Sequence, residues 1–343
     1  MPAANDVQAA LAVPLLALGA AALLSAFVTQ VSRPLLQRYA LARPNARSSH
    51  RIPTPQGAGI AVIAATLAVA SACAVWQNAT VPAPLIGATL FIAMVGFIDD
   101  LRPLPVLLRF VLHAIAVGTV LFTAPDDLRI FPTWPLGLER ALLLIAGLWF
   151  VNLVNFMDGL DLMTVSEVVP ITAALLLLGW LGHLPMTATL VATALCGAMI
   201  GFAPFNRPVA KIFLGDVGSL PIGLLLGWCL LQLAWHQHLA AALLLTAYYL
   251  ADSTVTLFRR ILKREQFWKA HRTHFYQRAT DNGFSVPQVI GEVFVLNLFL
   301  AALAVLSAVA NSVALSVPAL LAGAAAVALL LRRFSRARTA TKR

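Results

Sequence analysis

Residues 185–203 read PMTATLVATALCGAMIGFA, a run of 19 residues without a charged side chain. A helix rises about 1.5 Å per residue, so a run of this length crosses the hydrocarbon core of a bilayer. Backbone groups in lipid must be paired within the segment, which only a helix allows here. The chain contains ten further apolar runs, at 9–31, 57–76, 84–98, 105–124, 139–155, 167–182, 218–235, 238–258, 288–310 and 312–331. We therefore predict an all-α, polytopic integral membrane bundle of about 11 transmembrane helices.

The composition supports one membrane-embedded domain over residues 1–343, with a basic tail at 332–343. Hydrophobic residues make up 60% of the chain and charged residues only 11%, too few to cover a soluble protein of this size. The first run is preceded by Asp6 and by no Lys or Arg, and it is too long for a signal peptide core, so we expect a retained span. Three cysteines (Cys73, Cys196, Cys229) lie inside apolar runs and are interpreted as core residues.

The basic residues decide the orientation. The net charge of +10 alone is compatible with nucleic acid, anionic lipid or an anionic substrate. However, 22 of the 24 Lys and Arg residues fall in one alternating set of loops and in the tail, and only Arg129 and Arg140 fall on the other side. The positive-inside rule then places the N-terminus outside and the C-terminus in the cytoplasm. We expect membrane lipids and an anionic substrate as partners, and no nucleic acid.

Aspartates gather at the predicted cytoplasmic ends of the spans: Asp99 and Asp100 after the third, Asp158 and Asp161 after the fifth, and Asp216 before the eighth. Ionised groups at this depth are costly unless they pair, bind a metal or line a wet cavity. Because the helices offer few Lys or Arg partners, the pattern indicates a hard cation such as Mg²⁺. A solvated helix end remains an alternative for Asp99 and Asp100. On a helix these two point about 100° apart, so one can face a ligand while the other anchors locally.

A polar stripe ends the fifth span. Asn152, Asn155 and Asp158 recur every three residues and share one helix face, which must contact protein or a cavity. Gly159 then frees the backbone so that Asp161 can turn toward the same region. Hydrogen bonds between helices are the alternative role for the two asparagines.

The segment 213–219 reads FLGDVGS and predicts a glycine turn into a helix. Ser219 is a candidate N-cap and Pro221 suits the first turn. Such a helix start presents free N–H groups to a phosphate, and Asp216 could bring a metal there. Phe213 could stack on a base, although its residue type alone favours a core position.

Two basic loops are candidates for phosphate binding. Residues 271–278 read HRTHFYQR, in which His271 and His274 share a helix face beside Arg272 and Arg278. Zinc would need further ligands. Contact with anionic lipid is the alternative. Residues 49–59 read SHRIPTPQGAG, a rigid basic loop that contains Arg51.

In their order and sidedness, the five cytoplasmic segments between about Ser48 and Arg278 resemble the polyprenyl-phosphate N-acetylhexosamine-1-phosphate transferase superfamily, or glycosyltransferase family 4. The resemblance implies ten or eleven helices in the bacterial inner membrane and an active site on the cytoplasmic face. It also implies attack by undecaprenyl phosphate on the β-phosphorus of a UDP-amino-sugar, with release of UMP. Mg²⁺ would be required, with Mn²⁺ as an alternative, and a homodimer is left open.

The resemblance also implies residue roles. Asp216 matches the main Mg²⁺ ligand, with Asp158 as a second metal ligand. Phe213 matches the position that stacks on uracil, which reverses the preference for a core role. The implied catalytic residues are Asp99, Asp100, Asp158, Asp161, His271 and His274. The implied substrate-binding residues are Asn152, Asn155, Phe213, Arg51, Lys211, Arg272 and Arg278.

Two departures bear on the substrate. Asp161 is followed by Leu-Met where many members have a glycine, and the histidine segment is sparser than in much of the superfamily. That segment is similar to the WbpL-like branch, which starts O-antigen or other surface glycans, so we expect a UDP-N-acetyl-amino-sugar such as a 6-deoxy one. The alternatives are a peptidoglycan precursor transferase and a WecA-like GlcNAc-1-phosphate transferase. A secondary transporter is less consistent with spans whose central thirds are almost free of charge.

Overall fold

The computed structural model describes residues 4–42, 53–266 and 271–338, with side chains from residue 12 onward. Its main elements are thirteen α-helices, α1 (Ala4–Tyr39), α2 (Gly59–Trp76), α3 (Ala83–Leu101), α4 (Val106–Phe122), α5 (Leu136–Met157), α6 (Met163–Trp180), α7 (Met186–Phe202), α8 (Asp216–Trp235), α9 (Leu239–Leu245), α10 (Ala247–Leu262), α11 (Phe275–Asp281), α12 (Val286–Ala310) and α13 (Val313–Phe334). The described residues also form a short antiparallel pair, β1 (Leu41–Ala42) with β2 (Thr54–Pro55), and one 3-10 turn, η1 (Ala203–Phe205).

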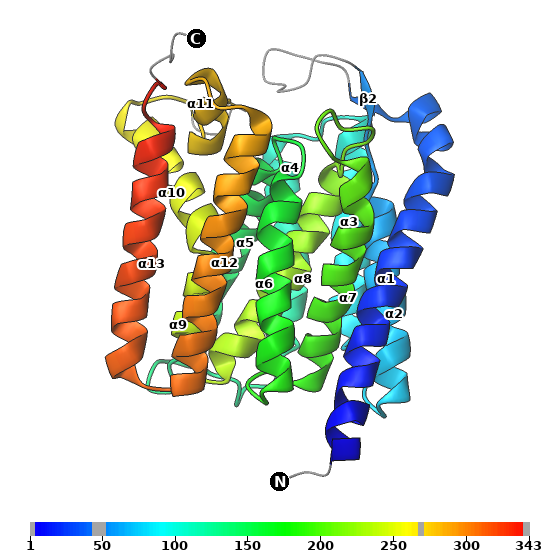
Figure 1. The fold of residues 1–343 in the computed structure, drawn as a ribbon, viewed down its shortest axis with the longest axis vertical. Helices are drawn as coiled ribbons and strands as arrows, with labels where there is room; N and C mark the ends of the chain where they lie inside the picture. Colours follow the sequence, from blue (N-terminus) through cyan, green and yellow to red (C-terminus); the bar gives the residue numbers. More distant parts are fainter. Residues whose placement is uncertain (1–3, 43–52, 267–270, 339–343) are drawn as a thin grey trace.

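The predicted class, a polytopic helical membrane bundle, is confirmed. Within the described residues, nine helices are long and apolar enough to cross a membrane: α1, α2, α3, α5, α6, α7, α8, α12 and α13. The bent pair of α9 and α10 makes a tenth crossing if it is counted as one span, and α4 is a shorter apolar helix at the predicted fourth span. The helices run alongside one another, and α1 begins at the opposite end of the bundle from the end of α13 (Figure 1). We call the end that carries β2, α11 and the last turn of α13 the basic end.

The predicted ninth span, 238–258, is not one straight helix. It consists of α9 and α10, which meet at an angle of 70°. At the break, the Thr246 hydroxyl donates to the carbonyl oxygen of Ala242 at 3.1 Å. A threonine that bonds back to the preceding turn in this way bends a helix. The apolar pattern could not reveal the break, because residues 239–251 form one uncharged run that continues through Thr246.

Close helix contacts place α7 and α8 in the interior. Gly197 and Gly201, one turn apart on α7, face the backbone carbonyls of Leu18 and Ala22 on α1, where a Cβ atom would clash. Small residues at such spacing allow membrane helices to approach closely. The apolar window of α8 is 83% buried, whereas that of α13 is only 17% buried. Thus α8 is a central helix and α13 is mostly exposed to lipid.

Candidate active site

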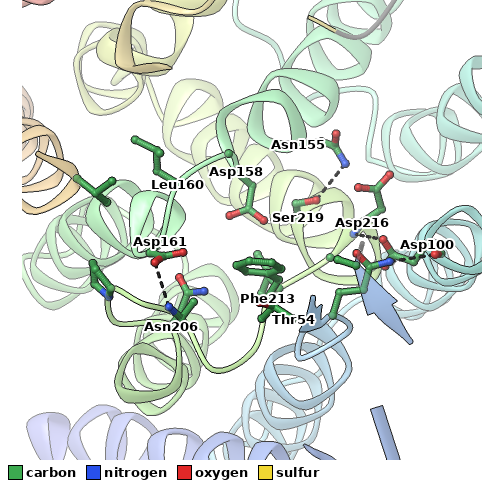
Figure 2. A pocket seen from close by; sticks show the side chains of 18 of the residues that line it. Thr54, Asp100, Asn155, Asp158, Leu160, Asp161, Asn206, Phe213, Asp216 and Ser219 are labelled. Carbon is green, nitrogen blue, oxygen red and sulfur yellow. Dashed lines mark hydrogen bonds between the residues drawn. The ribbon is translucent and has the colours of Figure 1, made fainter. Parts of the chain in front are cut away.

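Six predicted site residues line one cavity of about 570 Å³ at the basic end: Asp100, Asn155, Asp158, Asp161, Phe213 and Asp216. They come from the ends of α3 and α5, from the loop after α5, from the loop before α8 and from the first turn of α8. Figure 2 shows the four carboxylates around the cavity, with the Phe213 ring between them in this view. The fold therefore brings together residues that are more than 100 positions apart in the sequence.

Asp100 holds the start of α8. One of its carboxylate oxygens accepts the N–H of Asp216 at 3.0 Å, and the other accepts the N–H of Val217 at 3.1 Å. Gly215, with φ of +77°, precedes the helix, and a Cβ there would approach the Asp100 carboxylate to 2.6 Å. An anionic cap from another helix stabilises both the free N–H groups and the helix dipole. Asp100 thereby fixes the position of Asp216.

This cap corrects two expectations for the 213–219 segment. The helix begins at Asp216, so Ser219 is not its N-cap and Pro221 lies inside it. The physical reason is that a carboxylate from α3 supplies the cap that Ser219 was expected to supply. The first two N–H groups are therefore already bonded and are not free for a phosphate.

The loop before α8 is held against the segment that leads into α2. The Phe213 N–H donates to Pro55 at 2.8 Å, and the Phe213 carbonyl accepts the N–H groups of Gly57 and Ala58 at 3.1 and 3.0 Å. The Gln56 side chain donates to the Asp100 carbonyl at 2.9 Å. These bonds fix the backbone on both sides of the Phe213 ring, which lines the cavity.

Asp158 is half-buried where α5 ends. Its carboxylate accepts a hydrogen bond from the Thr164 hydroxyl. Burial raises the pKa of Asp158 to about 6, and the neighbouring Asp100 and Asp161 raise it further while Thr164 opposes the shift. A site that disfavours the carboxylate charge in this way is one in which a cation would be stabilising.

Two side chains connect the loop after α5 to the loop after η1. Asp161 accepts the N–H of Ala210 at 3.0 Å. Asn206 accepts the N–H of Leu162 at 2.6 Å and donates to the carbonyl of Ile212 at 3.0 Å. Asp161 therefore lines the cavity and also holds its wall together.

A second cluster, which we call the histidine corner, forms where α10 meets α11. Asp252 is fully buried and accepts the N–H groups of Phe275 and Tyr276 at 3.0 and 3.1 Å. The same carboxylate lies 3.1 Å from Nδ1 of His274. The His271 ring stacks on His274 with centroids 5.0 Å apart. Buried Asp252 therefore fixes both the start of α11 and the orientation of His274.

The histidine corner lies directly behind the cavity wall. The Tyr276 hydroxyl donates to the Phe156 carbonyl at 3.0 Å, two residues before Asp158. Gln277 of the same helix lines the cavity. Gly159 faces the Tyr276 hydroxyl so closely that a Cβ would clash with it. Gly159 has no positive φ, so its role is this close approach rather than the backbone freedom that the sequence suggested.

The other predicted residues lie outside the lining of the cavity. Asp99 pairs with Arg109 at 2.7 Å and accepts the N–H of Leu104 at 2.6 Å. Asn152 donates to the Leu148 carbonyl within α5 at 2.7 Å. The remaining ones are Lys211, which is exposed, Arg272, which contacts Asp281 at 3.4 Å, Arg278, which is exposed on α11, and the two histidines of the corner. Arg51 lies outside the described residues.

The donor set fits a magnesium ion that also binds substrate. Within the described ranges, no group of three or more His, Cys, Asp or Glu side chains could hold a metal by itself. Asp158 and Asp216 nevertheless line the same cavity, and carboxylate oxygens are the ligands that Mg²⁺ prefers. Because Mg²⁺ is commonly bound by one or two carboxylates together with substrate phosphates, a closed protein cage is not required.

Five neutral polar residues of the cavity were not predicted to line it. Thr54, Gln56, Asn206, Ser219 and Gln277 all line it. A single uncharged residue gives no periodic or charge signal. Their position in the sequence could have identified them, because these residues fall within or beside the segments already predicted to form the site. Asp252 lies in the predicted ninth span, and its link to residues 22 to 24 positions further on is a tertiary contact that one sequence does not show.

Part of the chain matches a family of known proteins. Residues 83–234 match the family model described as Glycosyl transferase family 4. The matched segment runs from the start of α3 almost to the end of α8 and contains the four cavity carboxylates. The match covers less than half of the chain.

Several curated proteins are similar to the chain. A Phospho-N-acetylmuramoyl-pentapeptide-transferase from Wolbachia pipientis wMel is 33% identical over 161 residues, which cover 42% of this chain and 49% of the relative. A Decaprenyl-phosphate N-acetylglucosaminephosphotransferase from Mycolicibacterium smegmatis is 32% identical over 232 residues, 60% of this chain and 57% of the relative. A Probable undecaprenyl-phosphate N-acetylglucosaminyl 1-phosphate transferase from Bacillus subtilis is 25% identical over 300 residues, 79% and 81%. The chain thus spans about half the length of the first two relatives.

Proposed function

We propose that this chain transfers an N-acetyl-amino-sugar 1-phosphate from a UDP-sugar to a polyprenyl phosphate and releases UMP. The observation that carries the proposal is the convergence of four carboxylates on one cavity at the basic end of a membrane bundle. Two of the relatives support it, because their names join decaprenyl or undecaprenyl phosphate to N-acetylglucosamine phosphate transfer. Charge neutralisation and positioning are the main requirements of phosphoryl transfer, and both suit this site.

In the proposed reaction, an oxygen of the polyprenyl phosphate forms a bond to the β-phosphorus of the UDP-sugar. The bond from that phosphorus to the bridging oxygen breaks, and UMP leaves with the bridging oxygen. The attacking phosphate is already anionic near neutral pH, so the site needs no strong general base. Polyprenyl phosphate is bound to the membrane, which fits a cavity at the end of a helical bundle.

The residues divide the work as follows. Asp216 and Asp158 would hold Mg²⁺, which when bound neutralises the charge of the diphosphate. Asp100 positions Asp216 through the N-terminus of α8. The Phe213 ring offers a face on which uracil can stack. The histidine corner supports the wall on which Asp158 lies.

The sugar and the pathway rest on sequence alone. The sparse histidine segment supports the WbpL-like branch and a surface glycan, whereas the named relatives favour N-acetylglucosamine or a peptidoglycan precursor. A panel of UDP-sugars, with mass spectrometry of the lipid product, separates these substrates. A homodimer, Mn²⁺ in place of Mg²⁺ and the cytoplasmic side of the site belong to the same proposal.

The decisive experiment replaces the proposed metal ligand. We expect Asp216→Ala to lower Mg²⁺-dependent UMP release at least about 100-fold, because it removes charge stabilisation at the reacting phosphates. The matched control is Asp127→Ala, an exposed carboxylate in the loop after α4, which should retain wild-type turnover. Wild-type turnover by a folded Asp216→Ala protein would refute the role of this carboxylate.

A further inference from the structure

A second, strongly basic cavity lies at the end of α13. Its volume is about 430 Å³, and it is lined by Phe284, Leu329, Arg332, Arg333, Arg336, Ala337 and Arg338. It shares no lining residue with the carboxylate cavity. The four arginines fall within seven consecutive residues, and all four are exposed. We call this cavity and the seven residues that line it the arginine pocket.

The positive charge of the arginine pocket is only partly compensated. Glu292 of α12 binds Arg333 through both of its oxygens, at 2.7 and 2.8 Å. Among the described residues, no carboxylate forms an ion pair with Arg332, Arg336 or Arg338. Arg338 instead donates to the neutral Gln288 side chain at 2.7 Å. Three guanidinium groups are therefore left to attract an anion.

Aromatic and backbone contacts give this cluster a defined shape. The guanidinium carbons of Arg333 and Arg338 lie 5.2 and 5.3 Å from the centroid of the buried Phe284 ring. The Asn282 side chain donates to the Phe334 carbonyl at 2.7 Å, and the Asn282 carbonyl accepts the backbone N–H of Arg338 at 3.0 Å. A basic segment that only set the membrane topology would need none of these contacts.

The location of the pocket indicates what kind of anion it binds. Helix α13 is mostly exposed to lipid, and its exposed residues Leu321 and Leu329 lie on the membrane side of the arginines. A lipid bound here would contact arginines with its phosphate and leucines with its acyl chain. Basic pockets beside membrane helices bind anionic headgroups in this way.

We propose that the arginine pocket is a binding site for the headgroup of an anionic glycerophospholipid. It is separate from the proposed catalytic cavity and does not depend on the proposed reaction. Binding is expected to hold the end of α13 against the loop at 282–285.

The test measures lipid preference directly. The full chain is purified, mixed with phosphatidylglycerol or phosphatidylcholine, and the bound lipid is counted by native mass spectrometry. We expect wild-type protein to prefer phosphatidylglycerol about 10-fold. The triple variant Arg332→Gln, Arg336→Gln, Arg338→Gln should lower that ratio to about 2-fold or less. A control that removes the same charge elsewhere, Arg38→Gln, Lys263→Gln, Arg264→Gln, should keep the wild-type ratio.

A charge-neutral variant separates a built site from general attraction. Phe284→Leu keeps all four arginines but removes the ring beneath two of them, so the ratio should fall several-fold. The proposal is overturned if wild-type protein shows no preference, if the triple variant and its control lose it equally, or if Phe284→Leu changes nothing. Polyprenyl phosphate is tested in parallel. If it is retained in preference to phosphatidylglycerol, the pocket binds substrate lipid and the proposal is also wrong.

Discussion

The two ends of the bundle use the same kinds of residue in opposite ways. At the end away from the basic loops, buried Glu139 binds Arg129 at 2.8 Å and accepts the Ile130 N–H at 2.8 Å. At the basic end, Asp158 and Asp216 line an open cavity, and no Lys or Arg in the described ranges pairs with them. The role of an acidic residue in a membrane protein can therefore be inferred from whether a cation pairs with it. A carboxylate that already has a cation indicates structure, whereas Asp158 and Asp216, which have none among the described residues and line a cavity, indicate a ligand.

The comparison is sharpest when one acid from each end is made neutral. Asp158→Asn should lower UMP release about 100-fold and raise the Mg²⁺ concentration needed for turnover, because a metal ligand loses its charge. Glu139→Gln should leave turnover within about 2-fold and lower the free energy of unfolding by about 1–3 kcal/mol, because Arg129 loses its charged partner. Turnover assays and thermal unfolding measure both effects. An equal loss of turnover in the two variants would contradict the distinction between the ends.

Replacing Asp252 tests whether an acid with several hydrogen-bond partners also contributes to turnover. Its carboxylate accepts two backbone N–H groups and contacts His274, and an amide cannot accept all three. We expect Asp252→Asn to lower turnover about 10- to 100-fold, the range seen when a group that orients a site residue is lost. Asp281→Asn, at the exposed end of α11, is the control. If only thermal stability falls, the histidine corner is purely structural.

A smaller effect is expected where the histidine corner touches the cavity wall. Gly159→Ala would push the Tyr276 hydroxyl away from its bond to the Phe156 carbonyl and displace Asp158, with about a 10-fold loss of turnover. Tyr276→Phe removes the clashing oxygen at the cost of one hydrogen bond, about 1 kcal/mol. In a double-mutant cycle, Tyr276→Phe should therefore restore part of the activity lost in Gly159→Ala. Additive losses would show that the two residues act independently.

Much of this arrangement was predictable, and the parts that were not have a common cause. Hydropathy located the crossings because lipid imposes length and composition on every span. The spacing of Asp99 and Asp100 predicted that they point apart, and in the structure Asp99 binds Arg109 while Asp100 lines the cavity. The cap that Asp100 places on α8, the bend at Thr246 and the partners of Asp252 could not be predicted. Each depends on which helices lie side by side, and a single sequence does not contain that information.

The smallest expected effect concerns the protonation of His271. Burial, the neighbouring His274 and the Arg260 guanidinium lower its pKa to about 4, from an ordinary value of 6.5. The folded state therefore disfavours the protonated ring, and the stability that this neutral ring supports is complete above pH 6.5 and is lost as the pH falls toward 4. The thermal midpoint of wild-type protein should accordingly drop over this window. The drop should be smaller in His271→Gln, which has no ring to protonate, and also in Arg260→Gln, because loss of the guanidinium charge raises the His271 pKa.

The control is His236→Gln, which replaces an exposed histidine at the opposite end and should follow the wild-type curve. Identical pH curves for wild-type and His271→Gln protein would show that His271 does not contribute to the acid sensitivity of the basic end.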